Sequence, residues 1–504
     1  MGRQKPSLLQ RAVNAAWYAT ASMKRNFQAA RRSRLTAGWG TRTSAGDANQ
    51  TIYRDHETLR QRSREQSINS PYIKRFHRLL KQNVIGPRGI QLQSKVNMLN
   101  GKPDKRSREK IEKSWKRFCK KGNFDVSGRY SYVTFLNLWI ETLARDGEVM
   151  VRLVRGYPNK WGFALQILEC DRLDIHYNDL LPNGNRIRMG VEVDEWERPI
   201  AYYLTVDHPG DVQHRQPARQ RHLRILANEL LHTFEPWRPH QSRGFTWAHA
   251  AMVELYHLDE YRRNEILAAE HGAKLTGFFE QDAEWMDPPG EDEEDAEIDE
   301  EIEAGTAKIL PYGLKFTPYK SDHPSANFAP FLKQGLRGTA AGLGPSYNRL
   351  ASDLEGVNFS SMRSGDLDDR DFYKSVQQFA ISELLDFVFE AWLEMSMLNG
   401  ELKLSFSSME RYLNYHWQPR GWDWVDPSKD AKAASESIRN RTKTRSYYIR
   451  QAGEDPDEVF DDMAREEEAL RERGLSVSVD PTKDSPNEPS SQKEDDEGDQ
   501  QNAA

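Results

Sequence analysis

Residues 366–397 read DLDDRDFYKSVQQFAISELLDFVFEAWLEMSM. Apolar side chains recur in this stretch at the spacing of one helical face. They are Phe372, Val376, Ala380, Leu384, Phe387 and Ala391, and Phe389 and Trp392 broaden the stripe. The pattern predicts a long helix that lies in a core or an interface.

The region before this helix, from about residue 70 to 235, predicts an α+β domain. Short apolar and β-branched runs alternate with turn residues such as Pro182-Asn183-Gly184-Asn185. The expected strands are 148–153, 163–168, 189–193 and 200–204, and the expected helices are 107–118 and 132–144.

Between this domain and the long helix, two further helices are expected, at 247–274 and 327–343. Two short strand candidates, 308–310 and 313–316, lie between them. The second helix contains Gly335, Gly338 and Gly342, each of which costs roughly 1 kcal/mol against alanine in an exposed helix. We therefore expect tight helix contact or a hinge there. Residues 345–364 are polar, and 430–470 read as helical again.

Composition limits the class of protein. The 504 residues suffice for two or three domains, and 10% aromatic residues exclude disorder throughout. No stretch approaches the roughly 18 apolar residues of a membrane-spanning helix. Two cysteines, Cys119 and Cys170, cannot form a disulfide framework and read as reduced thiols.

The net charge of −6 conceals three charged segments around a nearly neutral body. Residues 1–46 carry nine Lys or Arg and no acid, residues 281–303 carry thirteen acids and no base, and residues 474–504 carry eight acids and two bases. The basic arm fits a nucleic-acid or acidic protein contact, or a transit peptide. The tail composition predicts disorder.

No catalytic constellation is found. The sequence has no phosphate-binding loop of the NTPase kind, no metal-binding His or Cys spacing and no nucleophile elbow. Asp366, Asp368, Asp369 and Asp371 allow a two-metal nuclease, although acids also favour the first turn of a helix. We therefore predict no catalytic residue, metal or cofactor, with the nuclease as the alternative.

Several segments, in order, resemble the lambda-type phage portal proteins. They are FHRLLKQNVIGPRGI at 76–90, LARDGEV at 143–149, LQILECDRLD at 165–174, FEPWRP at 234–239, Arg243-Gly244, AAGLG at 340–344 and GVNFSSMR at 356–363. Departures from the family pattern are Phe359 in place of Tyr, Pro345-Ser346-Tyr347, and the acidic 281–303 segment.

The resemblance implies an α+β portal fold in a ring oligomer: such proteins form dodecamers at a capsid vertex of the virion.

 The family members are structural, not enzymes, and are assembled in the host cytoplasm. They pass double-stranded DNA inward during packaging and outward during ejection. Their partners are the terminase large subunit, the major capsid and scaffold proteins, and the head-completion connector, with no membrane.

Mapped by order, the resemblance implies a division of the chain into portal regions. They are a basic N-terminal arm (1–69), an α/β wing (70–246), a stem helix (247–275), a clip with the acidic segment (276–326), a second stem helix (327–344), a tunnel loop (345–364), a long wing helix and return (365–424), a helical crown (425–473) and a disordered acidic tail (474–504).

The same mapping gives two sets of expected site residues. Lys333, Arg337, Tyr347, Asn348 and Asn358 would face the DNA channel, and Glu291, Asp292, Glu293, Glu294 and Asp295 would dock a basic partner. Intersubunit ion pairing remains open for Lys333 and Arg337, and a solvated insertion for the acidic segment. A scaffold or adaptor that forms no ring is a third alternative for the whole chain.

Overall fold

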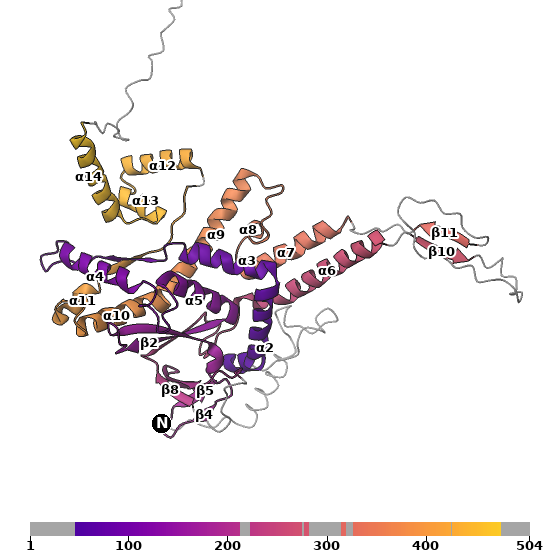
Figure 1. The fold of residues 1–504 in the computed structure, drawn as a ribbon, viewed down its shortest axis with the longest axis horizontal. Helices are drawn as coiled ribbons and strands as arrows, with labels where there is room; N and C mark the ends of the chain where they lie inside the picture. Colours follow the sequence, from indigo (N-terminus) through magenta and orange to yellow (C-terminus); the bar gives the residue numbers. More distant parts are fainter. Residues whose placement is uncertain are drawn as a thin grey trace, which may run out of the picture.

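The computed structural model describes residues 46–211, 222–274, 277–281, 314–318, 326–424 and 426–474. A mixed helix and sheet body carries a projecting pair of helices, α6 (Met252–Lys274) and α7 (Phe328–Leu343). The hairpin of β10 (Gly277–Gln281) and β11 (Leu314–Pro318) lies at the far end of that pair (Figure 1). The strand expected at 308–310, and most of the three charged segments, lie outside the described residues.

The folded body begins inside the range that the sequence assigned to the basic arm. Helix α2 (Ala48–Asn69) buries Ile52, His56 and Arg60. It is followed by α3 (Pro71–Leu80), where Ser70 and Pro71 separate the two helices. Residues 48–69 are therefore part of the body.

Two antiparallel sheets and a strand pair form the β part of the body. The three-stranded sheet has the order β3-β2-β9, the five-stranded sheet has the order β4-β5-β6-β7-β8, and β1 pairs with β12. The strands are β1 (Gln91–Ser94), β2 (Glu148–Arg155), β3 (Phe163–Leu168), β4 (Asp179–Leu180), β5 (Arg186–Arg188), β6 (Val191–Val193), β7 (Pro199–Thr205), β8 (His222–Leu226), β9 (Leu230–Phe234) and β12 (Tyr415–Gln418). All four strands expected for the domain are present.

The remaining helical elements connect these sheets and cover the core. They are η3 (Lys81–Ile85), α4 (Lys105–Phe118), α5 (Tyr132–Asp146), η4 (Cys170–Arg172), η5 (Trp247–Ala250), α8 (Tyr347–Ala351), η8 (Phe406–Ser408), α11 (Met409–Tyr412), α12 (Pro427–Arg439), α13 (Arg445–Ala452) and α14 (Pro456–Glu472). Within the described ranges, no helix combines the length and the apolar character that crossing a membrane requires.

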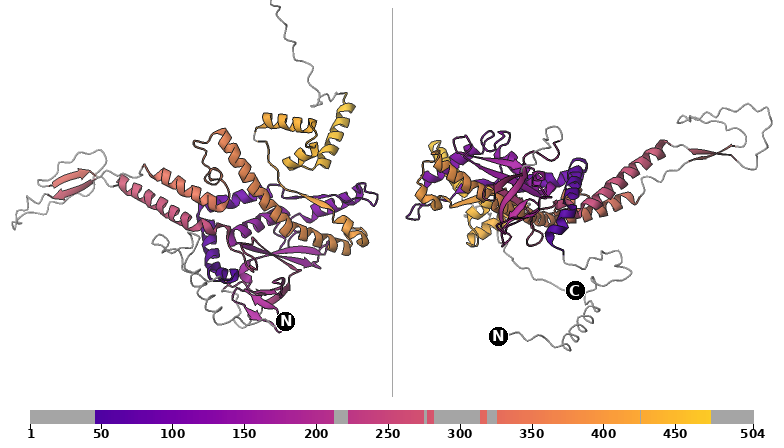
Figure 2. Two further views of the ribbon diagram at one scale, coloured as in Figure 1. Left: turned by 180° about the vertical axis from the view of Figure 1, so that it is seen from behind. Right: turned by 90° about the horizontal axis from the view of Figure 1, so that it is seen from below.

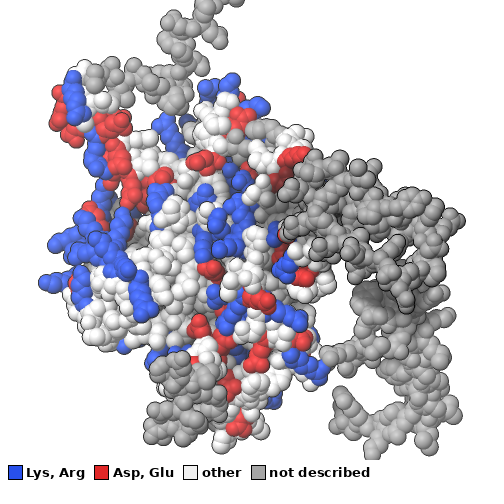
Figure 3. Space-filling model, turned by 45° about the vertical axis from the view of Figure 1, so that its right-hand side comes forward, with Lys and Arg blue, Asp and Glu red and all other residues white. Residues whose placement is uncertain are grey.

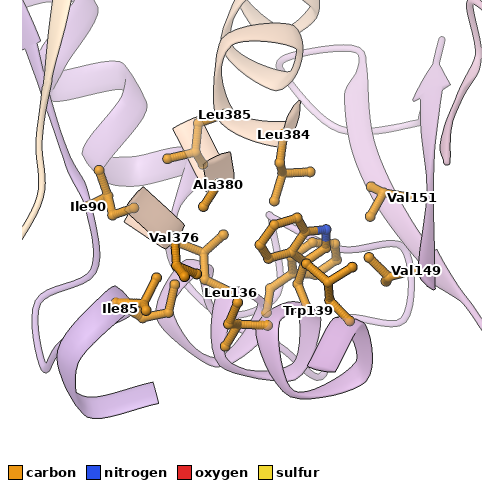
Figure 4. Packing of buried hydrophobic residues seen from close by; sticks show 14 of the residues in the cluster. Ile85, Ile90, Leu136, Trp139, Val149, Val151, Val376, Ala380, Leu384 and Leu385 are labelled. Atoms are coloured by element: carbon orange, nitrogen blue, oxygen red, sulfur yellow. The ribbon is translucent and has the colours of Figure 1, made fainter. Parts of the chain in front are cut away.

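The predicted long helix consists of α9 (Phe359–Ala380), a π-helical turn η7 (Ile381–Leu385) and α10 (Asp386–Leu398). It begins seven residues earlier than the sequence pattern indicated. Its core face packs against α5 and β2 (Figure 4), through Val376, Ala380 and Leu384.

One residue of the predicted stripe is wrong. Phe387 is 49% exposed, whereas its neighbour Val388 is buried. The π-turn explains the difference, because it inserts one extra residue into the turn and delays the apolar period by one position. The buried face therefore continues from Leu384 to Val388 and Trp392.

Helices α6 and α7 pack closely, as the glycines of α7 predicted. A Cβ atom added to Gly335 would lie 2.6 Å from Leu258 Cδ2, and one added to Gly338 would lie 2.8 Å from a carboxylate oxygen of Glu254. The glycines thus face α6 of the same chain. The pair projects from the body in every view (Figure 2).

Candidate functional site

The corner where α7 turns into α8 holds three of the five expected channel residues. Lys333 and Arg337, one turn apart on α7, both lie over the ring of Tyr347, at 5.9 and 5.6 Å from its centroid. Lys333 Nζ also lies 3.2 Å from Asp353 Oδ2. Lys333 is therefore ion-paired within its own chain, an arrangement that the sequence alternatives did not include, and Arg337 is exposed beside it.

A hydrogen bond fixes the loop that follows α8. The Tyr347 hydroxyl donates to Asp353 Oδ2 over 2.6 Å. This bond, the Glu355 backbone N–H and Lys333 lower the pKa of Asp353 to about 2. Partial burial, with the same hydrogen bond to Asp353, raises the pKa of Tyr347 to about 12. Across the neutral pH range the loop thus holds an ionised carboxylate and a protonated phenol.

The two asparagines of the predicted set have different surroundings. Asn358 Oδ1 accepts hydrogen bonds from the backbone N–H and the hydroxyl of Ser361, at 2.8 and 2.9 Å, so that Asn358 is the N-cap of α9. Asn348 is half-buried on α8. The expected docking residues 291–295 lie outside the described residues.

The aspartates considered for a nuclease lie inside α9, beyond its first turn, so the expectation that acids occupy the first turn of this helix is wrong. They have separate partners. Asp369 is buried and accepts hydrogen bonds from the backbone N–H and hydroxyl of Ser346, at 2.7 and 2.8 Å. Asp366 pairs with Arg349, and Asp371 pairs with Lys374. Asp366 and Asp369 thus tether the α7–α8 corner to α9, whereas Asp371 pairs within α9.

Within the body, the structure brings together three of the segments that carried the family resemblance. Glu148, at the start of β2, is fully buried and accepts hydrogen bonds from Arg243 Nη2 at 2.6 Å, from His232 Nε2 at 2.9 Å and from the Gly244 N–H at 3.0 Å. Arg60 of α2 also donates to Glu148. We call Glu148, Arg243, Arg60, His56 and His232 the buried ionic cluster.

Arg243 links the cluster to the second sheet. Its guanidinium donates to the carbonyl oxygens of Leu173 and Met189 at 3.0 Å each, and of Cys170 at 3.2 Å. The positive charges of Arg243 and Arg60 hold the pKa of Glu148 well below its usual range, against the opposing effect of burial. One side chain therefore joins segments 143–149, 165–174 and 243–244.

Two glycines allow segments 143–149 and 243–244 to lie in direct contact. Gly147 has φ +86°, and a Cβ there would lie 1.9 Å from the carbonyl carbon of Phe245. A Cβ on Gly244 would lie 2.2 Å from the carbonyl oxygen of Gly147. Both segments were identified from the sequence, but their contact was not predicted. The feature that could have indicated it is Glu148, an acid directly before an apolar strand.

Among the described residues, one group of three could supply ligands to a metal ion: Glu169, Asp171 and His208. His208 Nε2 lies 2.7 Å from Glu169, and Asp171 pairs with Arg60 and Arg64. Asp171 is thus already paired with two arginines, and none of the three was singled out from the sequence.

Comparisons with known proteins identify the class. A family model described as phage portal protein, lambda family, matches residues 32–377. The chain belongs to the lambda family of phage portal proteins.

Two sequence relatives agree with this assignment. The chain is 58% identical over 458 residues to the probable portal protein of Halomonas phage phiHAP-1, covering 90% of this chain and 88% of the relative. It is 22% identical over 399 residues to portal protein B of Escherichia phage lambda, covering 73% and 75%. A solved chain from the neck of an empty gene transfer agent particle shows 14% identity and a TM-score of 0.48, covering 84% of this chain and 98% of that one.

Family membership gives the protein a structural role as a portal in the head–tail connector of a virion, in a ring oligomer. Neither the comparisons nor the separate partners of the described aspartates favour the nuclease alternative.

Proposed function

We propose that this chain forms a dodecameric ring through which double-stranded DNA is packaged and ejected. In this proposal α6 and α7 are the stem, β10 and β11 belong to the clip, the α7–α8 corner faces the channel, and α12–α14 form the crown. The terminase and the head-completion proteins dock at the clip. The observation that carries the proposal is the projecting α6–α7 pair, which has a β-hairpin at its far end and the α8 corner at its base.

The charges at the corner suit a channel through which DNA must slide. Strong phosphate contacts would oppose sliding, because each contact adds to the affinity. Lys333 is neutralised by Asp353, which leaves Arg337 as the exposed cation beside Tyr347. We assign Arg337 to a weak contact with passing DNA and Lys333 to the position of the loop.

The ring is tested by light scattering on a sizing column together with negative-stain microscopy. Particles with a central hole and a mass of about 700 kDa, twelve chains of 58.3 kDa, are expected. A homogeneous monomer or dimer at all concentrations, with or without scaffold protein, would contradict the proposal.

The assignment of Arg337 is tested in an infectious phage or a packaging extract. Arg337→Ala should leave rings intact and reduce DNA retention, whereas Lys333→Ala should loosen the loop that Asp353 holds. Unchanged genome length and infectivity in Arg337→Ala would overturn its assignment without affecting the ring.

A further inference from the structure

Helix α4 is amphipathic, and its solvent side is basic. Ile111, Trp115 and Phe118 are buried in the core. On the opposite side, Arg106, Lys110, Lys113 and Arg117 follow one another at spacings of four, three and four residues, and Lys120 and Lys121 come directly after the helix. All six are exposed, and the four on the helix lie along one face because of their spacing. We call the six residues together the α4 basic row.

Two sets of bases on α4 have different surroundings. Those on one flank hold α14: Lys116 Nζ lies 3.2 Å from Glu458, and Arg108 Nη1 lies 3.6 Å from Asp457. In the basic row, Lys113 pairs with Glu109, and Arg117 lies 3.8 Å from Glu401. Arg106, Lys110, Lys120 and Lys121 have no carboxylate partner within the part of the chain that the structure describes.

The row lies far from the proposed channel. Helix α4 is at the end of the body opposite the α6–α7 pair in both the front and the rear view (Figures 1 and 2). In the space-filling view, Lys and Arg gather at the left margin of the molecule, on the side of α4 (Figure 3). The long helix runs from the α8 corner toward this end, so that in the ring the row would lie on the outer rim.

From these positions we infer that the α4 basic row binds the phosphate backbone of double-stranded DNA. Unpaired surface bases in a row attract a polyanion, and each phosphate contact releases counterions. A single-stranded ligand is disfavoured because the two aromatic residues of α4, Trp115 and Phe118, are buried and offer no stacking platform. An acidic protein is disfavoured because the row displays no apolar or aromatic anchor of the kind that dominates protein interfaces.

The inference rests on the proposed function only for the source of the DNA, which is packaged genome lying against the outer rim. It concerns a surface remote from the channel and assigns it an additional role: holding DNA outside the ring. Binding there would be independent of base sequence, since no groove-reading element accompanies the row.

The test measures binding of the full-length protein to a duplex by fluorescence anisotropy at several salt concentrations. A duplex of about 20 base pairs spans about 70 Å at 3.4 Å per step, which exceeds the roughly 21 Å length of α4 at 1.5 Å per residue. The test variant combines Arg106→Gln, Lys110→Gln and Lys121→Gln. The control variant combines Arg54→Gln, Arg62→Gln and Arg198→Gln, which are also exposed and lack carboxylate partners among the described residues.

The plot of log affinity against log salt should become shallower by about 2 to 3 in the test variant, at about 0.9 per lost phosphate contact. The control should keep the slope of the unmodified protein. Both variants retain the basic arm, so its contribution cancels.

Equal slopes in the test and control variants would overturn the inference, and selective loss of the test variant from capsid shells would then assign the row to an acidic protein. Ring mass, measured on the same samples, reports on the proposed function separately. Intact rings with unchanged DNA binding refute only the role of the row, whereas absence of rings in the unmodified protein refutes the portal assembly itself.

Discussion

Replacing Glu148 by Gln should destabilise the body strongly while preserving its shape. Gln is nearly isosteric but neutral. Its amide NH₂ group would replace one carboxylate oxygen and could not accept the hydrogen bonds that this oxygen receives. Arg60 keeps Asp171 as a partner, at 3.4 Å, whereas Arg243 has Glu148 as its carboxylate partner among the described residues. His56 cannot replace the lost negative charge, because an imidazole is either neutral or positive, and burial lowers its pKa and favours the neutral form.

The expected loss of stability arises because the guanidinium of Arg243 remains buried without a counter-charge. Breaking a buried ion pair by removing one partner costs about 3–5 kcal/mol. Hydrogen exchange of the β2 amides, measured by mass spectrometry, is the suitable assay because it reports the opening of this region alone. At 1.4 kcal/mol per factor of ten, exchange through opening of this region should accelerate by about two to three and a half decades.

Glu192→Gln is the matched control. Glu192 is also buried in a paired strand, β6, but the side chain of its arginine partner, Arg224, is 41% exposed and can be solvated when the charge is lost. The control should therefore change exchange much less. If Glu148→Gln changed the exchange of β2 by no more than Glu192→Gln does, the buried ionic cluster would not support the body in the way argued here.

Three further outcomes are expected. Gly147→Ala should prevent folding, since its Cβ would collide with Phe245, whereas Gly156→Ala, with φ +74° and open space around it, should lose only about 1–2 kcal/mol; soluble yield and thermal melting distinguish them. Burial lowers the pKa of His77 from 6.5 to about 4. The free energy of unfolding therefore includes about 3 kcal/mol that is present above pH 6.5 and is lost as the pH falls toward 4. Urea unfolding at several pH values should show this loss in the native chain and not in His77→Gln. Asn358→Ala should destabilise the first turn of α9 by about 1 kcal/mol, seen as faster amide exchange confined to that turn, and exchange that stayed at the native rate would refute the capping role.

Much of the architecture could be predicted from the sequence because local periodicity encodes it. The strand at 163–168 has the predicted bounds, and the glycines of α7 correctly indicated close packing. The register after Ile381 could not be predicted, since a π-turn leaves no periodic signal before it shifts the pattern, and Phe387 was therefore assigned to the wrong face.

The candidate site was predicted less completely, because pairing partners come from distant segments. The family resemblance predicted that Lys333 faces the channel, which stays a prediction, and it gave no reason to choose Asp353 as the partner of Lys333. Glu148 and Arg243 were noticed only as parts of similar segments. Their contact depends on two folded sheets, which no local pattern encodes.

The pairing of β1 with β12 has a consequence for synthesis of the chain. Gln91 lies opposite Gln418, so that β1 has no strand partner until nearly the whole body has been translated. At about 5–20 residues per second, the delay is about 15 to 65 s. During that interval the ribosome carries a nascent chain with an open strand edge and uncovered apolar side chains, which is the kind of surface that chaperones recognise. Folding of this body is thus completed late in translation, by the return of its C-terminal part.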